Sequence, residues 1–209
     1  MNIRFASLVA TAGMALLATQ VQAESLVDGS AEAGQAKSIT CTACHGPQGN
    51  SMSALWPNIA GQNAPYVIAQ LQAFKEGTRN DPLMTPQAML LSDEDMADLA
   101  VYYEGLPEAT QPVKDASLVA RGEALYRGGD LDKGIAACLA CHGPSGMGNP
   151  AAKYPALRGQ HADYTAKQLN DYAAGARTSD GATNVMRDIA ARLSADDIAA
   201  LSSYVQGLR

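Results

Sequence analysis

The chain has 209 residues, of which 47% are hydrophobic, 17% are charged and 5% are aromatic. This length suits one or two small globular domains, and the hydrophobic share is typical of folded proteins. The formal net charge of −6 at pH 7 argues against a nucleic-acid-binding protein, because such proteins carry basic patches that match phosphates.

Residues 1–23 are predicted to be a secretory signal peptide. Arg4 supplies a positive charge, residues 5–18 are apolar and small, and Val21-Gln22-Ala23 has the small-X-small pattern of a signal-peptidase site. The apolar stretch is too short to span a bilayer comfortably. The mature chain is therefore expected to begin near Glu24 and to work in the periplasm.

The remaining sequence is an internal repeat, which predicts two similar domains. The matched segments are Cys41–His45 with Cys138–His142, Trp56-Pro57 with Tyr154-Pro155, Gly61-Gln62 with Gly159-Gln160, Gln70-Leu71 with Gln168-Leu169, and Leu91-Ser92 with Leu193-Ser194. Each copy has the size of one small domain. We expect a first domain over residues 24–106, a second over residues 116–209, and a linker over residues 107–115, where two prolines break regular structure.

Both copies have a helical pattern, without runs of β-branched residues that would indicate strands. The helices expected in the first domain cover residues 31–40, 65–76 and 93–105, and those expected in the second cover residues 118–126, 163–174 and 195–207. Glycines stand where several of these helices end, and Ser92 and Ser194 begin capping boxes. Gly122 is expected to let the first and last helices of the second domain cross closely.

Two Cys-X-X-Cys-His motifs contain all four cysteines and two of the three histidines of the chain. Cysteines three residues apart on a helical turn share a face, where both thiols can reach the two vinyl groups of one porphyrin. The next residue, a histidine, can ligate the iron. The motif is the attachment sequence of c-type haem, so we expect two covalent haem c groups. The predicted binding residues are Cys41, Cys44, His45, Cys138, Cys141 and His142.

Three other readings of the cysteine pairs are less consistent with the sequence. A zinc site would need the pairs roughly 12–20 residues apart, but Cys44 and Cys138 lie much further apart. A thioredoxin-like redox pair would need a βαβ context, and the flanking segments are helical. Structural disulfides would not explain why a histidine follows each pair.

Methionine is the usual partner of histidine in electron-transfer haems. Met84 and Met186 both stand eight residues before a capping serine, so the repeat selects them as the sixth ligands of the two irons. Met89 is the alternative in the first domain, but its repeat partner is Ala191.

Four further residues are predicted to support the haem sites. Pro57 lies 12 residues after His45 and Pro155 lies 13 residues after His142. The carbonyls of these prolines could accept the other ring N–H of each histidine. Arg79 and Arg177 are matched in the repeat and could hold haem propionates. His161, the remaining histidine, is expected at a helix N-terminus or on the surface rather than on an iron.

These motifs make the chain similar to the cytochrome c4 family, whose members consist of two fused class I cytochrome c domains. The resemblance covers essentially the whole mature chain. It implies an all-α fold of two tandem class I cytochrome c domains, each wrapped around a covalent haem, with the two His/Met haems facing each other across the domain interface. It also implies an electron carrier rather than an enzyme, with a cytochrome bc complex as donor and a haem–copper terminal oxidase as acceptor. Some members associate with the membrane, so peripheral association is a further expectation.

Charge separates the two predicted domains. Residues 24–106 contain 3 basic and 10 acidic residues, whereas residues 116–209 contain 10 basic and 9 acidic residues. Such asymmetry can orient a redox partner and speed its encounter.

Two other functions stay open at this point. A di-haem peroxidase would leave one iron open, which a methionine at both positions argues against, and a cytochrome subunit of a dehydrogenase complex would need a docking surface that the sequence does not reveal.

Overall fold

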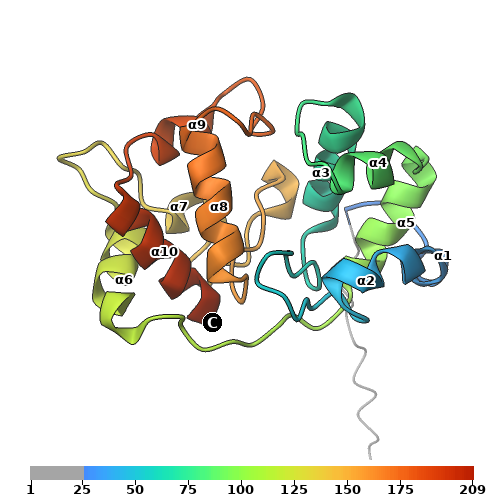
Figure 1. Cartoon of the computed structure of the whole chain (residues 1–209), viewed down its shortest axis with the longest axis horizontal. Coiled ribbons are helices and arrows are strands. Elements are labelled where there is room, and N and C mark those ends of the chain that lie inside the picture. The colour runs from blue at the N-terminus through green and yellow to red at the C-terminus, as the bar shows by residue number, and fades with distance from the viewer. Residues whose placement is uncertain (1–25) are drawn as a thin grey trace, which may run out of the picture.

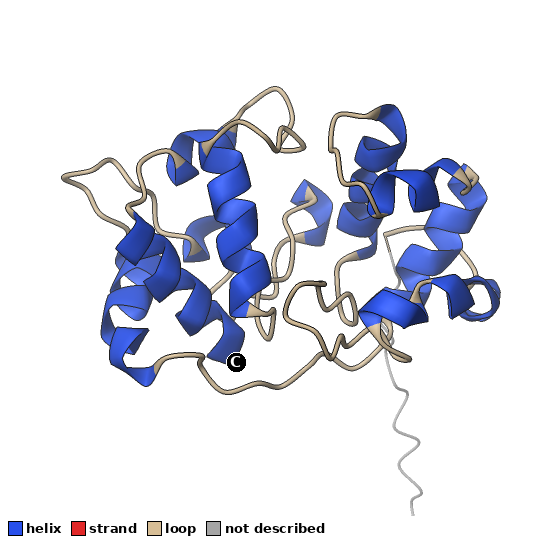
Figure 2. Ribbon diagram, viewed as in Figure 1, coloured by secondary structure: helices blue, strands red, loops and turns tan. Residues whose placement is uncertain are grey.

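The computed structural model describes residues 26–209, so the predicted signal peptide lies outside the described residues. Figure 2 shows only helices and loops in that part of the chain, which confirms the all-α prediction. None of the helices between residues 26 and 209 is long and apolar enough to cross a membrane.

Two helical bodies lie side by side, and the repeat in the sequence is also a repeat in the structure (Figure 1). The first body contains α1 (Ala31–Lys37), α2 (Thr42–His45), α3 (Ala64–Glu76), α4 (Met84–Met89) and α5 (Asp93–Glu104). The second contains α6 (Val119–Gly128), α7 (Leu139–His142), α8 (Ala162–Ala173), α9 (Val185–Ala190) and α10 (Ala195–Gly207). The segment predicted to be the linker runs along the lower edge of the view, from α5 to α6. We refer to the two bodies as the first and second domains.

The expected long helices are present, and capping boxes explain where the last helix of each domain begins. Ser92 Oγ accepts a hydrogen bond from the Asp95 amide, and the Asp95 carboxylate accepts one from the Ser92 amide, so the capping box of α5 is complete. Ser194 and Asp197 form the same box on α10. The structure differs from the prediction at some ends: residues 38–40 continue α1 as a 3-10 helix, and α8 ends before the predicted residue 174.

In both domains the first helix crosses the last at a glycine. A Cβ on Gly122 of α6 would lie 2.4 Å from the carbonyl oxygen of Ala200 in α10, which confirms the close crossing expected there. Gly34 of α1 meets Asp98 of α5 in the same way, because a Cβ there would lie 2.1 Å from the Asp98 carbonyl oxygen. Any side chain at these points would force the helices apart, so the glycines set the frame of each domain.

Two short helices, α4 and α9, were not predicted. Each has only 6 residues, too few for hydrophobic periodicity to show. A matched aspartate holds the chain just before each of them. Asp81 accepts hydrogen bonds from the amides of Leu83 and Met84 at 2.9 and 3.0 Å. Asp180 accepts from the Arg187 amide at 3.0 Å and from the Arg187 guanidinium at 2.8 Å. These hydrogen bonds hold the backbone at Met84 and next to Met186 in position.

Candidate haem-binding site

A cavity of about 700 Å³ extends through both domains and is lined mainly by apolar side chains. All twelve site residues predicted from the sequence line it. They are Cys41, Cys44, His45, Pro57, Arg79, Met84, Cys138, Cys141, His142, Pro155, Arg177 and Met186. The space between the helices is therefore organised around the predicted haem residues of both repeats.

The cysteine motifs form single helical turns. α2 and α7 each end at the motif histidine and are closed by glycines with positive φ, Gly46 at 80° and Gly143 at 78°. No disulfide joins these four cysteines, so all four are available for thioether bonds. Before a thioether forms, burial raises the pKa of the Cys138 thiol to about 11.

Each motif histidine is buried and oriented by a proline carbonyl. His45 Nδ1 lies 2.9 Å from the carbonyl oxygen of Pro57, and His142 Nδ1 lies 3.0 Å from that of Pro155. A carbonyl can only accept, so Nδ1 carries the proton and Nε2 presents its lone pair to the cavity. Burial lowers the pKa of both histidines, although the proline carbonyls oppose this shift. The neutral imidazole that a metal requires is therefore favoured.

The two predicted methionines line the cavity, and the alternative does not. Met84 begins α4 and Met186 lies in the first turn of α9, and both contribute to the wall of the cavity. The Met89 side chain is 63% exposed and is not among the lining residues. The structure thus places one thioether and one motif histidine of each domain around the same space. Iron ligation by these residues stays a prediction.

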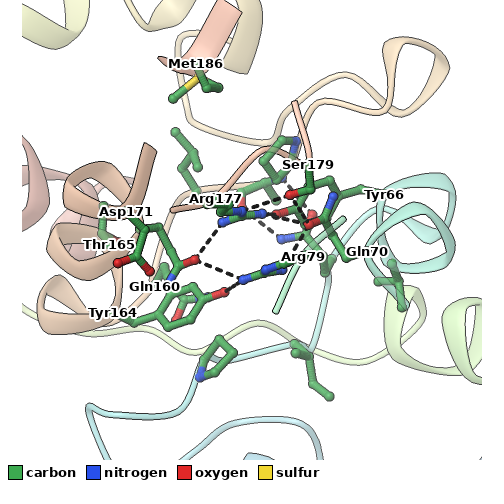
Figure 3. Close-up of a pocket in the computed structure, with 18 of the residues that line it drawn as sticks. Tyr66, Gln70, Arg79, Gln160, Tyr164, Thr165, Asp171, Arg177, Ser179 and Met186 are labelled. Carbon is green, nitrogen blue, oxygen red and sulfur yellow. Dashed lines mark hydrogen bonds between the residues drawn. The ribbon is translucent and has the colours of Figure 1, made fainter. Parts of the chain in front are cut away.

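Arg79 and Arg177 lie buried at the domain interface, where each contacts the opposite domain (Figure 3). Arg79 donates to Gln70 of its own domain, and also to Tyr164 and Gln168 of the second domain, each at 2.9 Å. Arg177 makes the equivalent hydrogen bonds from the second domain to the first. It donates to Gln168 of its own domain, and to Tyr66 and Gln70 of the first domain, each at 2.8 Å. The sequence did not predict this crossed network, although Gln70 and Gln168 are matched in the repeat.

The positive charges of Arg79 and Arg177 show whether the site suits an anionic cofactor such as haem. Within residues 26–209, neither Arg79 nor Arg177 forms an ion pair with a carboxylate, and their hydrogen-bond partners are neutral. Burial would raise the pKa of Tyr164, but the two guanidinium groups outweigh it and lower that pKa. Buried cations without anions are costly. Haem carries propionate groups, which are anionic, so the charge of the site fits this cofactor.

The third histidine of the chain contributes to the contact between the two domains. His161 occupies the N-cap position of α8, which agrees with the expected helix N-terminus, and its side chain is buried. Its Nε2 lies 3.0 Å from the carbonyl oxygen of Ser51 in the first domain. Asn63, the matched residue, donates to the carbonyl oxygens of Met147 and Tyr154 in the second domain at 3.2 and 2.9 Å. The beginnings of α3 and α8 thus contribute reciprocal contacts to the domain interface.

Comparison with known proteins agrees with this geometry. The sequence pattern of the Cytochrome c family matches residues 31–106 and again residues 119–209. Cytochrome c4 of Pseudomonas aeruginosa is 47% identical over 208 residues, which cover 100% of each chain. The crystal structure of reduced recombinant cytochrome c4 from Pseudomonas stutzeri superimposes with a TM-score of 0.84 at 47% identity and covers 87% of this chain and 100% of that one.

A relative of lower identity has a name that states a different role. A thiosulfate dehydrogenase electron acceptor of Stutzerimonas stutzeri is 37% identical over 174 residues, which cover 79% of this chain and 77% of the relative. The chain is therefore similar in sequence to proteins with more than one named role.

Proposed function

Because this chain belongs to the cytochrome c4 family of di-haem electron-transfer proteins, we propose that it carries single electrons in the periplasm, from a cytochrome bc complex toward a haem–copper terminal oxidase. The observation that supports this most is the shared cavity, in which each domain presents two thiols, one oriented histidine and one methionine. The chain binds two haem c groups covalently, and each supplies an iron that changes its charge by one electron.

The protein residues have distinct roles in this proposal. The thiols of each motif would bind the porphyrin covalently, and Nε2 of His45 and of His142 would ligate the iron. Met84 and Met186 would supply a second ligand to each iron, and both irons would then be closed to small molecules. A closed ligand set changes little between oxidation states, which suits a carrier and disfavours a peroxidase.

Arg79 and Arg177 would anchor haem propionates at the domain interface. Their guanidinium groups are held by glutamine and tyrosine side chains from both domains, so their positions are fixed before any anion binds. Charge-assisted hydrogen bonds to carboxylates are stronger than neutral ones, and a fixed guanidinium loses little freedom in making them. Both guanidinium groups would then hold anionic groups of the haems at the domain interface.

A second candidate is the role of electron acceptor for a periplasmic dehydrogenase. The observation that favours it is the similarity to the thiosulfate dehydrogenase electron acceptor of Stutzerimonas stutzeri. In both cases the chain accepts and donates single electrons, and only the donor differs.

Stopped-flow reduction of the oxidised holoprotein separates these candidates. The purified protein is mixed with a reduced bc complex or with thiosulfate and its dehydrogenase, and reoxidation by a haem–copper oxidase is followed in a second experiment. We expect fast reduction by the bc complex and fast reoxidation by the oxidase. Reduction by the dehydrogenase alone would favour the second candidate, and peroxide turnover by the protein itself would contradict both.

A further inference from the structure

Two buried glutamines at the domain interface form matched contacts that cross from one domain to the other. Gln62 and Gln160 directly follow the matched glycines Gly61 and Gly159 of the two repeats and are each 9% exposed. Each uses its side-chain amide to bind the backbone N–H and the backbone C=O of a single residue in the opposite domain. The contact is therefore a two-point clamp rather than one hydrogen bond.

The clamp of Gln160 holds Asn58 of the first domain. The Asn58 amide donates to Gln160 Oε1 at 2.9 Å, and Gln160 Nε2 donates to the Asn58 carbonyl oxygen at 2.8 Å. Gln160 Oε1 also accepts from the His161 amide at 3.0 Å, which ties the glutamine to its own domain. Because two N–H groups converge on Oε1, the orientation of the side-chain amide is fixed by its partners.

The clamp of Gln62 holds Ala156 of the second domain in the same way. The Ala156 amide donates to Gln62 Oε1 at 2.8 Å, and Gln62 Nε2 donates to the Ala156 carbonyl oxygen at 2.9 Å. The Asn63 amide, at 3.0 Å, ties Gln62 to the first domain. The two clamps are thus equivalent and reciprocal.

The clamped residues directly follow the prolines that orient the motif histidines. The N–H of Asn58 and the C=O of Pro57 belong to one planar peptide group. That group donates to Gln160 on one side and accepts from His45 Nδ1 on the other. The peptide between Pro155 and Ala156 connects Gln62 to His142 in the same manner. Each chain of hydrogen bonds therefore begins in one domain and ends at the histidine of the other.

We propose that Gln160 is a positioning residue for the haem of the first domain, and Gln62 for the haem of the second. Hydrogen bonds in series polarise one another, so donation to the glutamine makes the proline carbonyl a better acceptor. A stronger bond at Nδ1 fixes the imidazole ring and raises its basicity as a ligand. A more basic ligand stabilises the ferric state and lowers the reduction potential of that haem. The inference rests on the proposed ligation by His45 and His142.

The test uses the di-haem holoprotein and the variants Gln160→Met and Gln62→Met, which keep the length of the side chain but remove its hydrogen bonds. Site-resolved reduction potentials are measured by titration followed by nuclear magnetic resonance. Gln160→Met is expected to favour the ferrous state of the first-domain haem by up to about fivefold, the equivalent of one neutral hydrogen bond. The second-domain haem is expected to stay unchanged. Gln62→Met gives the same prediction with the haems exchanged, so one variant suffices if the other does not fold.

Gln206→Met is the matched control. Gln206 also binds backbone groups at both ends of its amide, accepting from the Ala162 amide at 2.9 Å and donating to the Pro112 carbonyl oxygen at 2.8 Å. None of these groups belongs to a peptide that contacts a motif histidine. We expect neither haem to change its potential, and a shift as large as that of Gln160→Met would overturn the proposal.

Two direct readouts separate this proposal from the ligation on which it rests. In the reduced wild-type protein, the ring protons of His45 and His142 should show the large shifts of ligands lying over a porphyrin, and their absence would refute the ligation. If they are present, Gln160→Met should speed hydrogen exchange at the Asn58 amide and move the Nδ1–H resonance of His45. Equal shifts in both haems, a shift confined to the haem of the mutated domain, or an unchanged Nδ1–H resonance would overturn the clamp.

Discussion

The crossing of α6 and α10 gives a prediction whose magnitude follows from the structure. Gly122→Ala would place a Cβ 2.4 Å from the Ala200 carbonyl oxygen, 2.6 Å from the Tyr204 Cβ and 3.0 Å from the Ala200 carbonyl carbon. Two of the three close atoms belong to backbone, which cannot rotate away, so the helices must separate. Both helices line or flank the haem cavity through Tyr126 and Leu201, so this separation would loosen the second domain around its cofactor.

Two opposing effects set the size of the loss. Overpacking of this kind costs about 1–3 kcal/mol, and the upper end applies here because backbone must move. Replacing glycine by alanine within a helix returns up to about 1 kcal/mol. We therefore expect a net destabilisation of about 2 kcal/mol in the second domain. For a domain of this size each kcal/mol lowers the midpoint of thermal unfolding by roughly 4–8 °C.

The same helix provides the control. A Cβ on Gly128 would meet nothing within 4 Å, so Gly128→Ala should gain helix propensity without a clash and be slightly stabilising. Thermal unfolding of both holoprotein variants, followed by far-ultraviolet circular dichroism, measures the difference. The packing argument would be refuted if the Gly122 variant were as stable as the wild type, or if both variants lost stability equally.

Three other predictions follow from the site and from the charges. Met84→Ala should open one iron, change its optical spectrum and lower its reduction potential. Met89→Ala should leave the spectrum and the potential unchanged. The reverse result would show that Met89 is the ligand. The first-domain haem should have the lower reduction potential, because that domain carries the acidic excess. The difference should be on the order of tens of millivolts, because exposed charges are screened. Equal or inverted potentials in site-resolved spectroelectrochemistry would contradict the charge argument. Burial would raise the pKa of Asp197, but Lys133 and Arg121 outweigh it and lower that pKa below its usual 3.8. The stability that the carboxylate contributes is therefore complete above pH 3.8 and lost as the pH falls further, so Asp197→Asn should flatten the acid limb of a pH–stability curve, and an unchanged limb would contradict this.

The sequence predicted those features that depend on local pattern or on the repeat. The capping boxes at Ser92 and Ser194 are local signals, and the structure contains both. The proximity of Pro57 to His45 also followed from a short spacing, and the structure contains that hydrogen bond. The choice of Met84 over Met89 came from comparing the repeats, and the structure places only Met84 on the cavity wall. Repetition thus supplied information that a single copy would not.

Contacts between the domains were beyond sequence reasoning. The repeat matched Arg79 with Arg177 but did not show that each would reach the glutamine of the other domain. It matched the Gly-Gln pairs without indicating that their side chains bind the backbone across the interface. Pairing between two domains depends on their relative orientation, which has no periodicity along the chain. The short helix α4 was missed because one and a half turns show no hydrophobic pattern.

The optical spectrum of the reduced holoprotein, recorded with and without carbon monoxide, tests the central claim most directly. The account predicts two closed His/Met haems, so the spectrum should show two low-spin haems per chain and carbon monoxide should leave it unchanged. Met84→Ala should then make one of the two haems bind the gas. Binding of carbon monoxide by one haem of the wild-type protein would contradict the account, because it would reveal an open iron of the kind that a peroxidase needs.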